Sequence, residues 1–461
     1  MAQGVTSGKA RGFLVLIVLI GVAFLALSAF RAGPAPSISI AANLPGIGKL
    51  TAVHVEIEEP ARGLGDVRVE FIQGDRTELL QSRTHVPLPP WQYWGERQQS
   101  DVFDLEVGSR TLKKLKEGPA KIRVTAERAS SWLRYPPAAV HELTLEVKLR
   151  PPGLQVLSRQ TYVKQGGAET VVYRVGESSI KDGVVAGERW FPGFPLPGGD
   201  EQERFAIFSA PYDLNDPAEI RLVAMDDVGN EAQASFLDRF TPRTPRTGRI
   251  SLPESFLSRV VPAIMAQTPE VEDQGSLLAN YLEINGKLRA ENRAHLVELA
   301  AQSEPEFLWR GGFIQMRNAQ VMSDFATRRT YYYDGKEVDT QFHLGFDLAS
   351  VKLAEIQASN DGIVVVARYF GIYGNCVVID HGYGLMSLYG HLSTINVEVG
   401  QRVERGDVVG RSGATGLAGG DHLHFGILLQ GLPVDPREWW DEHWIQDRLA
   451  LKLGDALPFP R

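Results

Sequence analysis

The stretch "GATGLAGGDHLHFGILL", residues 413–429, passes from a glycine-rich loop into a hydrophobic run and places two histidines one residue apart. If the run is a β-strand, alternate side chains point to opposite faces, so His422 and His424 share one face. Leu423 and Phe425 then take the other face, where they can contribute to a core. A hydrogen-bonded histidine pair at a strand start is an equally ordinary interpretation, so other segments must decide between them.

The segment "DTQFHLGFDLAS", residues 339–350, supplies a second pair of polar side chains. His343 stands four residues before Asp347, and imidazole and carboxylate groups are both ordinary zinc ligands. That spacing is a weak signal by itself. Together with His422 and His424, however, it offers three protein ligands and an open fourth position, which is the pattern of a catalytic zinc site.

Two further histidines lie between these segments. His381 begins "HGYG", residues 381–384, which predicts a hairpin turn, and we expect a structural or merely exposed role for it. In the strand that follows, Ser387, Tyr389 and His391 alternate onto one semi-polar face. His391 therefore ends a strand as a histidine of a cleft would.

Four motifs carry a family resemblance. "HLGFD", "GNCVVIDHGYGLMSLYGHLS", "VEVGQRVERGDVVGRSGATG" and "HLHF" occur in the order and spacing of the lysostaphin/LytM-type zinc metallopeptidases, across residues 320–438. The resemblance implies a small, mostly antiparallel β-fold with a groove across a sheet. It also implies hydrolysis of peptide bonds in the stem peptides or cross-bridges of bacterial peptidoglycan.

The resemblance assigns roles to individual residues. It implies that one Zn²⁺ ion is held by His343, Asp347 and His424. It also implies that His391 and His422 match two further family histidines, which act in catalysis without being primary ligands. A zinc-bound water would be activated for attack on the peptide bond, and a histidine can exchange protons near neutral pH. Which of the two histidines is the general base stays open.

The same motifs leave an alternative function open. Some proteins that carry this domain have lost metal ligands and activate other cell-wall hydrolases without being catalytic. A third interpretation makes the chain a structural or adhesive spacer whose β-modules are the working part. Because all the expected ligands and both accessory histidines are present, we favour the zinc endopeptidase. Peptidoglycan is the expected partner, and a cell-wall or division protein partner is not identified.

Composition excludes one class of partner. The 461 residues carry a net charge of −8 and a pI near 5.8, whereas a nucleic-acid-binding face is usually basic. We therefore expect no nucleic-acid partner.

The N-terminal region predicts a membrane anchor. Residues 12–30 carry no charge and follow Lys9 and Arg11, and about twenty apolar residues span a bilayer as a helix. A cleaved signal peptide is the rival interpretation. We expect an inner-membrane, single-pass protein with the bulk of the chain periplasmic or extracellular.

The remaining pattern predicts a mainly β chain with several domains. Alternating segments separated by turns indicate two immunoglobulin-like β-sandwich modules, and a capping signature introduces helices that form a spacer or pack on the last domain. The predicted divisions are residues 1–35 (cytoplasmic stub and transmembrane helix), 36–150 and 151–245 (sandwich modules), 246–305 (helical spacer), 306–445 (LytM-type antiparallel β peptidase domain) and 446–461 (C-terminal tail).

Overall fold

The computed structural model describes residues 6–30, 34–86, 95–130 and 135–459. The chain divides into two compact units, of which the first comprises Met1–Pro151 with Met225–Glu231 and the second comprises Pro152–Ala224 with Ala232–Arg461. Strands dominate both units, as the sequence predicts for a mainly β protein. The domain boundaries predicted within these units stay a prediction.

The N-terminal helix α1 (Thr6–Phe30) does not bear out the predicted anchor. Among the residues that the structure describes, no helix is both long and apolar enough to cross a membrane. A crossing helix needs about twenty apolar residues in succession. The predicted localisation, a single-pass inner-membrane protein held through residues 12–30, is wrong on this finding. Residues 1–5 and 31–33 of the predicted stub and anchor lie outside the described residues.

Two sheets with one hydrophobic core form most of the first unit. Along β3 (Thr51–Glu58) the side chains are alternately buried and exposed, because every second residue of a strand faces the core. The immunoglobulin-like character of this part stays a prediction. The strand orders are β1 (Ser37–Ala42), β3 (Thr51–Glu58), β6 (Ser100–Val107) in one sheet and β2 (Gly46–Ile47), β8 (Ala139–Val147), β7 (Gly118–Arg128), β4 (Leu64–Gln73), β5 (Arg76–Thr84) in the other.

The second unit begins with two four-stranded sheets and one short parallel pair. The first sheet has the order β14 (Phe194–Pro195), β15 (Glu203–Ser209), β11 (Ala168–Val175), β9 (Leu154–Val156). The second has the order β13 (Arg189–Pro192), β12 (Lys181–Ala186), β16 (Ile220–Met225), β17 (Glu231–Ala234), and the pair is β10 (Tyr162–Lys164) with β18 (Arg239–Thr241).

An eight-stranded sheet forms the centre of the second unit. Its order is β20 (Gln320–Ser323), β23 (Phe346–Ala349), β31 (Leu423–Leu429), β27 (Leu385–Leu392), β26 (Asn375–Asp380), β25 (Gly362–Tyr369), β29 (Arg402–Val403), and β32 (Leu432–Val434) pairs with β31. Two three-stranded sheets accompany it, with the orders β19 (Arg246–Ser251), β21 (Thr327–Tyr333), β22 (Lys336–His343) and β24 (Glu355–Gln357), β30 (Val408–Arg411), β28 (Thr394–Ile395).

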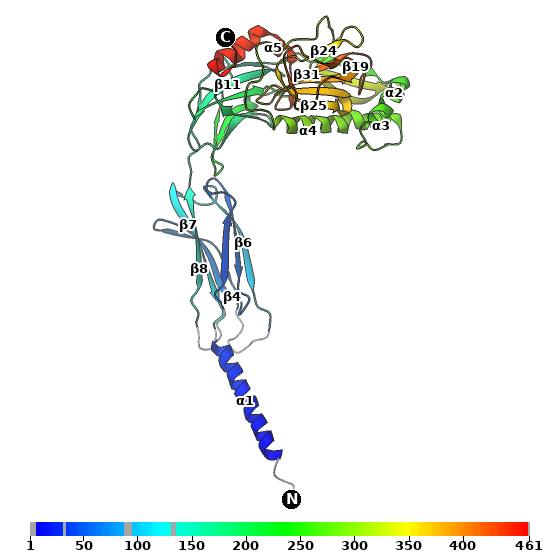
Figure 1. Cartoon of the computed structure of the whole chain (residues 1–461). Coiled ribbons are helices and arrows are strands. Elements are labelled where there is room, and N and C mark those ends of the chain that lie inside the picture. The colour runs from blue at the N-terminus through cyan, green and yellow to red at the C-terminus, as the bar shows by residue number, and fades with distance from the viewer. Residues whose placement is uncertain (1–5, 31–33, 87–94, 131–134, 460–461) are drawn as a thin grey trace. The chain divides into compact units, whose positions relative to one another are not determined.

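Helices cover one face of the eight-stranded sheet. Met386 and Leu388 of β27 share a hydrophobic core with α2 (Glu254–Met265), α3 (Leu277–Glu283) and α4 (Arg289–Ala300). Helix α4 lies along the sheet that contains β25 (Figure 1). A π-helical turn, η2 (Ile284–Leu288), joins α3 to α4. The helices of residues 246–305 are therefore packed on the C-terminal sheet.

The opposite face of the sheet contributes to a second core. Leu423 and Phe425 of β31 belong to it together with side chains of β11 and β15. The C-terminal helices α5 (Pro436–Trp440), α6 (Glu442–Ile445) and α7 (Leu451–Leu453) add to the same core, where Trp439 is fully buried. Because both faces are covered, the central strands are rigid supports for any side chain at their ends.

Candidate functional site

Three strands bring the candidate ligands together. In the antiparallel pair β23–β31, Asp347 lies opposite His424, and on the other side of β31 the partner of His424 is Gly390 in β27. His343 is the last residue of β22, and two residues separate it from the start of β23. The alternation along β31 sends Leu423 and Phe425 into one core and leaves His424 on the opposite face, as the sequence predicts.

The ligand atoms of His343, Asp347 and His424 form a small triangle. Nε2 of His343 lies 2.9 Å from Oδ1 of Asp347 and 3.1 Å from Nδ1 of His424, which is 3.1 Å from the same carboxylate oxygen. Ligands of a tetrahedral zinc ion, at about 2.1 Å from the metal, are about 3.4 Å apart. The three buried side chains therefore fit one zinc-sized ion, and they are the one such group among the described residues.

Polar contacts outside this triangle fix the orientation of His343. Its Nδ1 lies 3.1 Å from the carbonyl oxygen of Asp324. A hydrogen bond there requires the proton on Nδ1, which leaves the lone pair of Nε2 directed at Asp347 and His424. The imidazole is thus held in the tautomer that a metal ligand requires.

Arg329 is a site residue that the sequence interpretation missed. Its Nη2 donates hydrogen bonds to Oδ2 of Asp347 at 2.6 Å and to Oγ of Ser323 at 2.7 Å. A signal existed in the hairpin β21–β22, where Thr327 pairs with His343. Because side chains alternate, Arg329 lies two residues from Thr327 on the face of the hairpin that carries His343.

Gly345 allows His424 to approach. A Cβ at this position would lie 2.6 Å from both Cε1 and Nε2 of the His424 ring and 2.7 Å from the carbonyl oxygen of Phe425. No side chain fits between these atoms without a shift of the main chain or of the ring. The glycine of "HLGFD" is therefore required for the close packing of the candidate ligand His424.

His391 reaches the site by a route that alternation alone does not predict. The side chains of Tyr389 and Ser387 point into the core on the far face, where their hydroxyls lie 2.9 Å apart. Strict alternation would send His391 to that same face, yet it lines the cavity beside His424. The backbone of His391 has φ of 63°, a left-handed conformation that re-aims the side chain. Leu392 returns to the core.

The two accessory histidines face each other. The ring centroids of His391 and His422 are 4.8 Å apart. Nδ1 of His391 lies 2.8 Å from the carbonyl oxygen of Thr415, and Nδ1 of His422 lies 2.8 Å from that of Gly420. Both Nδ1 atoms thus donate to the main chain, which leaves Nε2 of each ring for other partners. Nε2 of His422 is 3.5 Å from Oδ1 of Asp347.

Burial and neighbouring charges separate the proton affinities of these groups. Burial raises the pKa of Asp347, but the charge and hydrogen bonds of the histidines, His343 foremost, outweigh it and hold that pKa well below its ordinary value. Burial lowers the pKa of His391 well below the ordinary value, and the charges of His422 and His424 lower it further. Burial also lowers the pKa of His422, but the hydrogen bond and the charge of Asp347 outweigh burial, so that this pKa is raised above its ordinary value.

His381 lies apart from this group. The side chain is fully buried, with Nε2 2.8 Å from the hydroxyl of Ser387 and Nδ1 2.6 Å from the carbonyl oxygen of Asp361. Burial lowers its pKa to about 4. One contact ties the hairpin turn to the loop at Asp361 and the other ties it to β27, so the role of His381 is structural.

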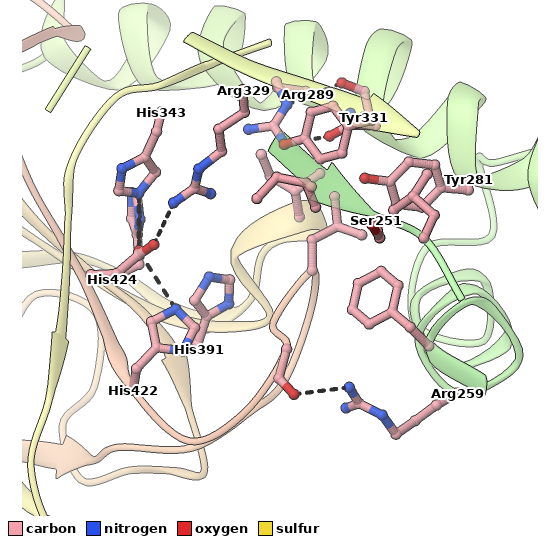
Figure 2. A pocket seen from close by; sticks show the side chains of 18 of the residues that line it. Ser251, Arg259, Tyr281, Arg289, Arg329, Tyr331, His343, His391, His422 and His424 are labelled. Atoms are coloured by element: carbon pink, nitrogen blue, oxygen red, sulfur yellow. Dashed lines mark hydrogen bonds and ion pairs between the residues drawn. The ribbon is translucent and has the colours of Figure 1, made fainter. Parts of the chain in front are cut away.

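A single cavity of about 560 Å³ adjoins all five candidate residues. Figure 2 shows the histidines gathered on one side, with Ser251, Arg259 and Tyr281 opposite. The opposite wall comes from the end of β19, from α2 and from α3, which sequence interpretation did not connect with the site. The ligand triangle and the histidine pair therefore open onto a space large enough for part of a peptide.

Comparison with known proteins agrees with this arrangement. Residues 341–436 match the model of Peptidase family M23. The chain is 32% identical over 169 residues to the peptidoglycan DD-endopeptidase ShyA of Vibrio cholerae, which covers 37% of this chain and 36% of that protein. It is 38% identical over 116 residues to ShyB of the same organism, covering 25% and 26% of the two chains.

A regulatory protein is also similar. The murein hydrolase activator EnvC of Escherichia coli is 37% identical over 95 residues, which covers 21% of this chain and 23% of EnvC. The chain thus matches between 23% and 36% of the length of each of these curated relatives. The matched segment contains the ligand triangle, both accessory histidines and Gly345, and residues 341–436 of this chain are a Peptidase family M23 domain.

Proposed function

We propose that the chain is a zinc metalloendopeptidase that hydrolyses peptide bonds in the stem peptides or cross-bridges of peptidoglycan. The observation that carries the proposal is the convergence of three ligand atoms, 2.9 to 3.1 Å apart, on a cavity that two further histidines also line. The similarity to peptidoglycan DD-endopeptidases supports the choice of substrate.

His343, Asp347 and His424 would hold the zinc ion. When bound there, zinc lowers the pKa of a coordinated water and polarises a carbonyl group. Asp347 uses one carboxylate oxygen toward the two imidazoles and the other toward Arg329, so its orientation is fixed from both sides. The fixed orientation holds the ligand atoms together without reorganisation when substrate binds.

His391 and His422 would perform the proton transfers. In both rings Nδ1 donates to a main-chain carbonyl, so Nε2 is the atom available for exchange. We assign the proton acceptor to His391, which is more deeply buried and has its neutral form favoured by its surroundings. His422, close to Asp347, is suited to hold a proton and donate a hydrogen bond to the developing oxyanion.

The second candidate function is a non-catalytic regulator that binds and activates other cell-wall hydrolases. The similarity to the activator EnvC favours it. The complete ligand triangle disfavours it, because a protein that only binds a partner has no need of three converging buried ligands. Whether the chain acts as a peptidase or as an activator, a cell-wall or division protein partner stays a prediction.

Purified chain incubated with purified sacculi separates the two functions. We expect about one zinc ion per chain and release of soluble muropeptides, with both lost on chelation and restored by added zinc. An activator would instead release nothing alone and would increase the release caused by an added murein hydrolase. Zinc-free protein that digests sacculi would contradict the proposed mechanism.

A further inference from the structure

The cavity carries an excess of positively charged side chains. Three arginines line the cavity, Arg259, Arg289 and Arg329, against one carboxylate, Asp347. This excess stands out because the whole chain carries a net charge of −8. A cleft with one sign of charge attracts ligands of the opposite sign.

Only one of these arginines is neutralised by an acidic residue in the cavity. Arg329 is paired with Asp347. Arg289 instead donates from Nε to the main-chain oxygen of Asn285 at 3.0 Å and from Nη2 to the side-chain oxygen of the same residue. Among the described residues no carboxylate lies within salt-bridge distance of Arg289. The nearby Asp339 accepts a hydrogen bond from the Asn285 amide at 2.7 Å.

Asn285 therefore orients Arg289 without neutralising it. Asn285 belongs to the π-helical turn η2, and Arg289 is the first residue of α4. Such π-helical turns inside helices are frequent at functional sites. A guanidinium has five N–H donors, of which two are used here, so further donors are available to a ligand. A half-buried arginine held in this way has lost much of its side-chain entropy before any ligand binds.

Aromatic side chains connect Arg289 with the candidate metal ligands. The ring of Tyr373 lies 5.5 Å from that of His424, and the charge of Arg289 acts on the hydroxyl of Tyr373, lowering its pKa against the effect of burial. Tyr281 and Tyr331, whose ring centroids are 6.1 Å apart, lie beside Arg289 on the same side of the cavity (Figure 2). Arg289 therefore lines the part of the cavity that a bound peptide would reach.

We propose that Arg289 binds a free carboxylate of the peptide substrate, so that the cavity selects anionic peptides over their amidated forms. The inference rests on the proposed peptidase function and adds a substrate class to it. Arg259 contributes positive charge from α2, where its Nη2 donates to the carbonyl oxygens of Ala418 and Gly419 at 3.2 and 3.3 Å. It thereby ties α2 to the loop before β31.

Two forms of one synthetic peptide test the proposal. A stem-peptide dimer would be prepared with its side-chain carboxyl groups either free or converted to carboxamides. Binding is measured by calorimetry with the full-length, zinc-loaded His391→Ala variant, and cleavage is measured with the wild type. We expect the free acid to bind and to react about 10- to 100-fold better, the range of a charge-assisted hydrogen bond.

Substitutions of Arg289 test whether the preference for the free acid depends on this residue. Arg289→Met should bind the two forms equally, and Arg289→Lys should retain part of the preference, because it keeps the charge without the forked geometry. Lys287→Gln is the matched control, since this cation on the same turn is exposed and pairs with Glu283 at 3.3 Å. Zinc content, measured on each variant, shows that the fold and the ligand triangle are intact.

The outcomes distinguish the inference from the proposed function. Equal binding of both peptide forms by the wild-type cavity would overturn the inference even if both are cleaved. Preference for the free acid in Arg289→Met would overturn it as well. A preference in binding that Arg289→Met abolishes, with no cleavage of either form by the wild type, would uphold the carboxylate site and refute the peptidase.

Discussion

Arg329 contacts one oxygen of Asp347, and the two candidate ligand histidines, His343 and His424, contact the other. The guanidinium donates to Oδ2 at 2.6 Å, while Oδ1 lies 2.9 Å from Nε2 of His343. The carboxylate is thus clamped between a permanent cation and the candidate ligand atoms. A group in this position orients a metal ligand without touching the metal, and such partners commonly influence metal affinity strongly.

Removal of Arg329 should weaken metal binding. Arg329→Met leaves Oδ2 of Asp347 without its charged partner, so the carboxylate can rotate away from the imidazoles. We expect zinc affinity to fall about 10- to 100-fold, as measured by competition with a chromophoric chelator. Arg328→Met is the control, because this neighbour in the same strand is exposed. Equal zinc affinity in both variants would show that Arg329 has no positioning role.

A methyl group at Gly345 should displace His424. The added Cβ would lie 2.6 Å from the imidazole of His424 and 2.7 Å from the carbonyl oxygen of Phe425. Because one of these two neighbours is main chain, a small shift cannot relieve both contacts. We expect Gly345→Ala to lose most bound zinc and to cost about 1–3 kcal/mol of stability, as overpacking does. Gly426→Ala in β31 is the control, since the nearest atom to its Cβ would be 3.7 Å away. Full zinc occupancy in Gly345→Ala would contradict the packing described for the ring.

The left-handed backbone of His391 should be visible in stability measurements. At φ of 63° an alanine carries a steric cost that glycine avoids, of about 1–2 kcal/mol. His391→Gly should therefore be more stable than His391→Ala by about 1 kcal/mol in thermal or denaturant unfolding. At the exposed strand residue Thr394 the order should be reversed, because glycine weakens an ordinary strand. The same order at both positions would argue against a re-aimed His391.

The features of the site that can be predicted from the sequence are those that follow from rules local to one strand or motif. The alternation of β31 places His424 opposite the core face of Leu423 and Phe425, and that was predictable because the rule is local to one strand. The motifs and their family resemblance identify His343 and Asp347 as neighbours of His424. The structure brings all three together.

Other features of the site could not be predicted because they depend on tertiary structure. The direction of the His391 side chain depends on the left-handed backbone conformation of His391 itself. Prediction from strand alternation presumes an extended backbone at every residue. The contact between Arg329 and Asp347 depends on the pairing of Thr327 with His343, and this register of the hairpin β21–β22 becomes known only from the structure. The cavity wall comes from α2 and α3, whose packing on the sheet was one of two arrangements that the sequence left open.

Glu438 should make the second unit less stable as pH rises. Its carboxylate accepts a hydrogen bond from the main-chain N–H of Ala168 at 2.7 Å, and burial raises its pKa from 4.5 to about 8. The folded chain then keeps a proton that the unfolded chain loses above pH 4.5, so unfolding releases a proton between these values. Stability should fall by up to about 1.4 kcal/mol per pH unit in this window.

The matched comparison is the pH dependence of thermal unfolding in two variants. Glu438→Gln keeps an acceptor for Ala168 but cannot ionise, so its unfolding temperature should decline less than that of the wild type from pH 4.5 to 8. Glu442→Gln removes an exposed carboxylate nearby and should follow the wild type. A Glu438→Gln variant with the pH profile of the wild type would mean that Glu438 is already ionised in the folded protein.

Zinc content and muropeptide release, determined on the same samples of His422→Ala and His424→Ala, test the division of the site into ligands and proton-transfer groups. His424 supplies one of the three candidate ligand atoms of the triangle, so His424→Ala should lose the metal and all activity. His422→Ala keeps the triangle, so it should retain zinc while release of soluble muropeptides falls by a factor of about 100 to 10,000. Loss of zinc from His422→Ala together with its retention in His424→Ala, or full activity in both, would contradict this division.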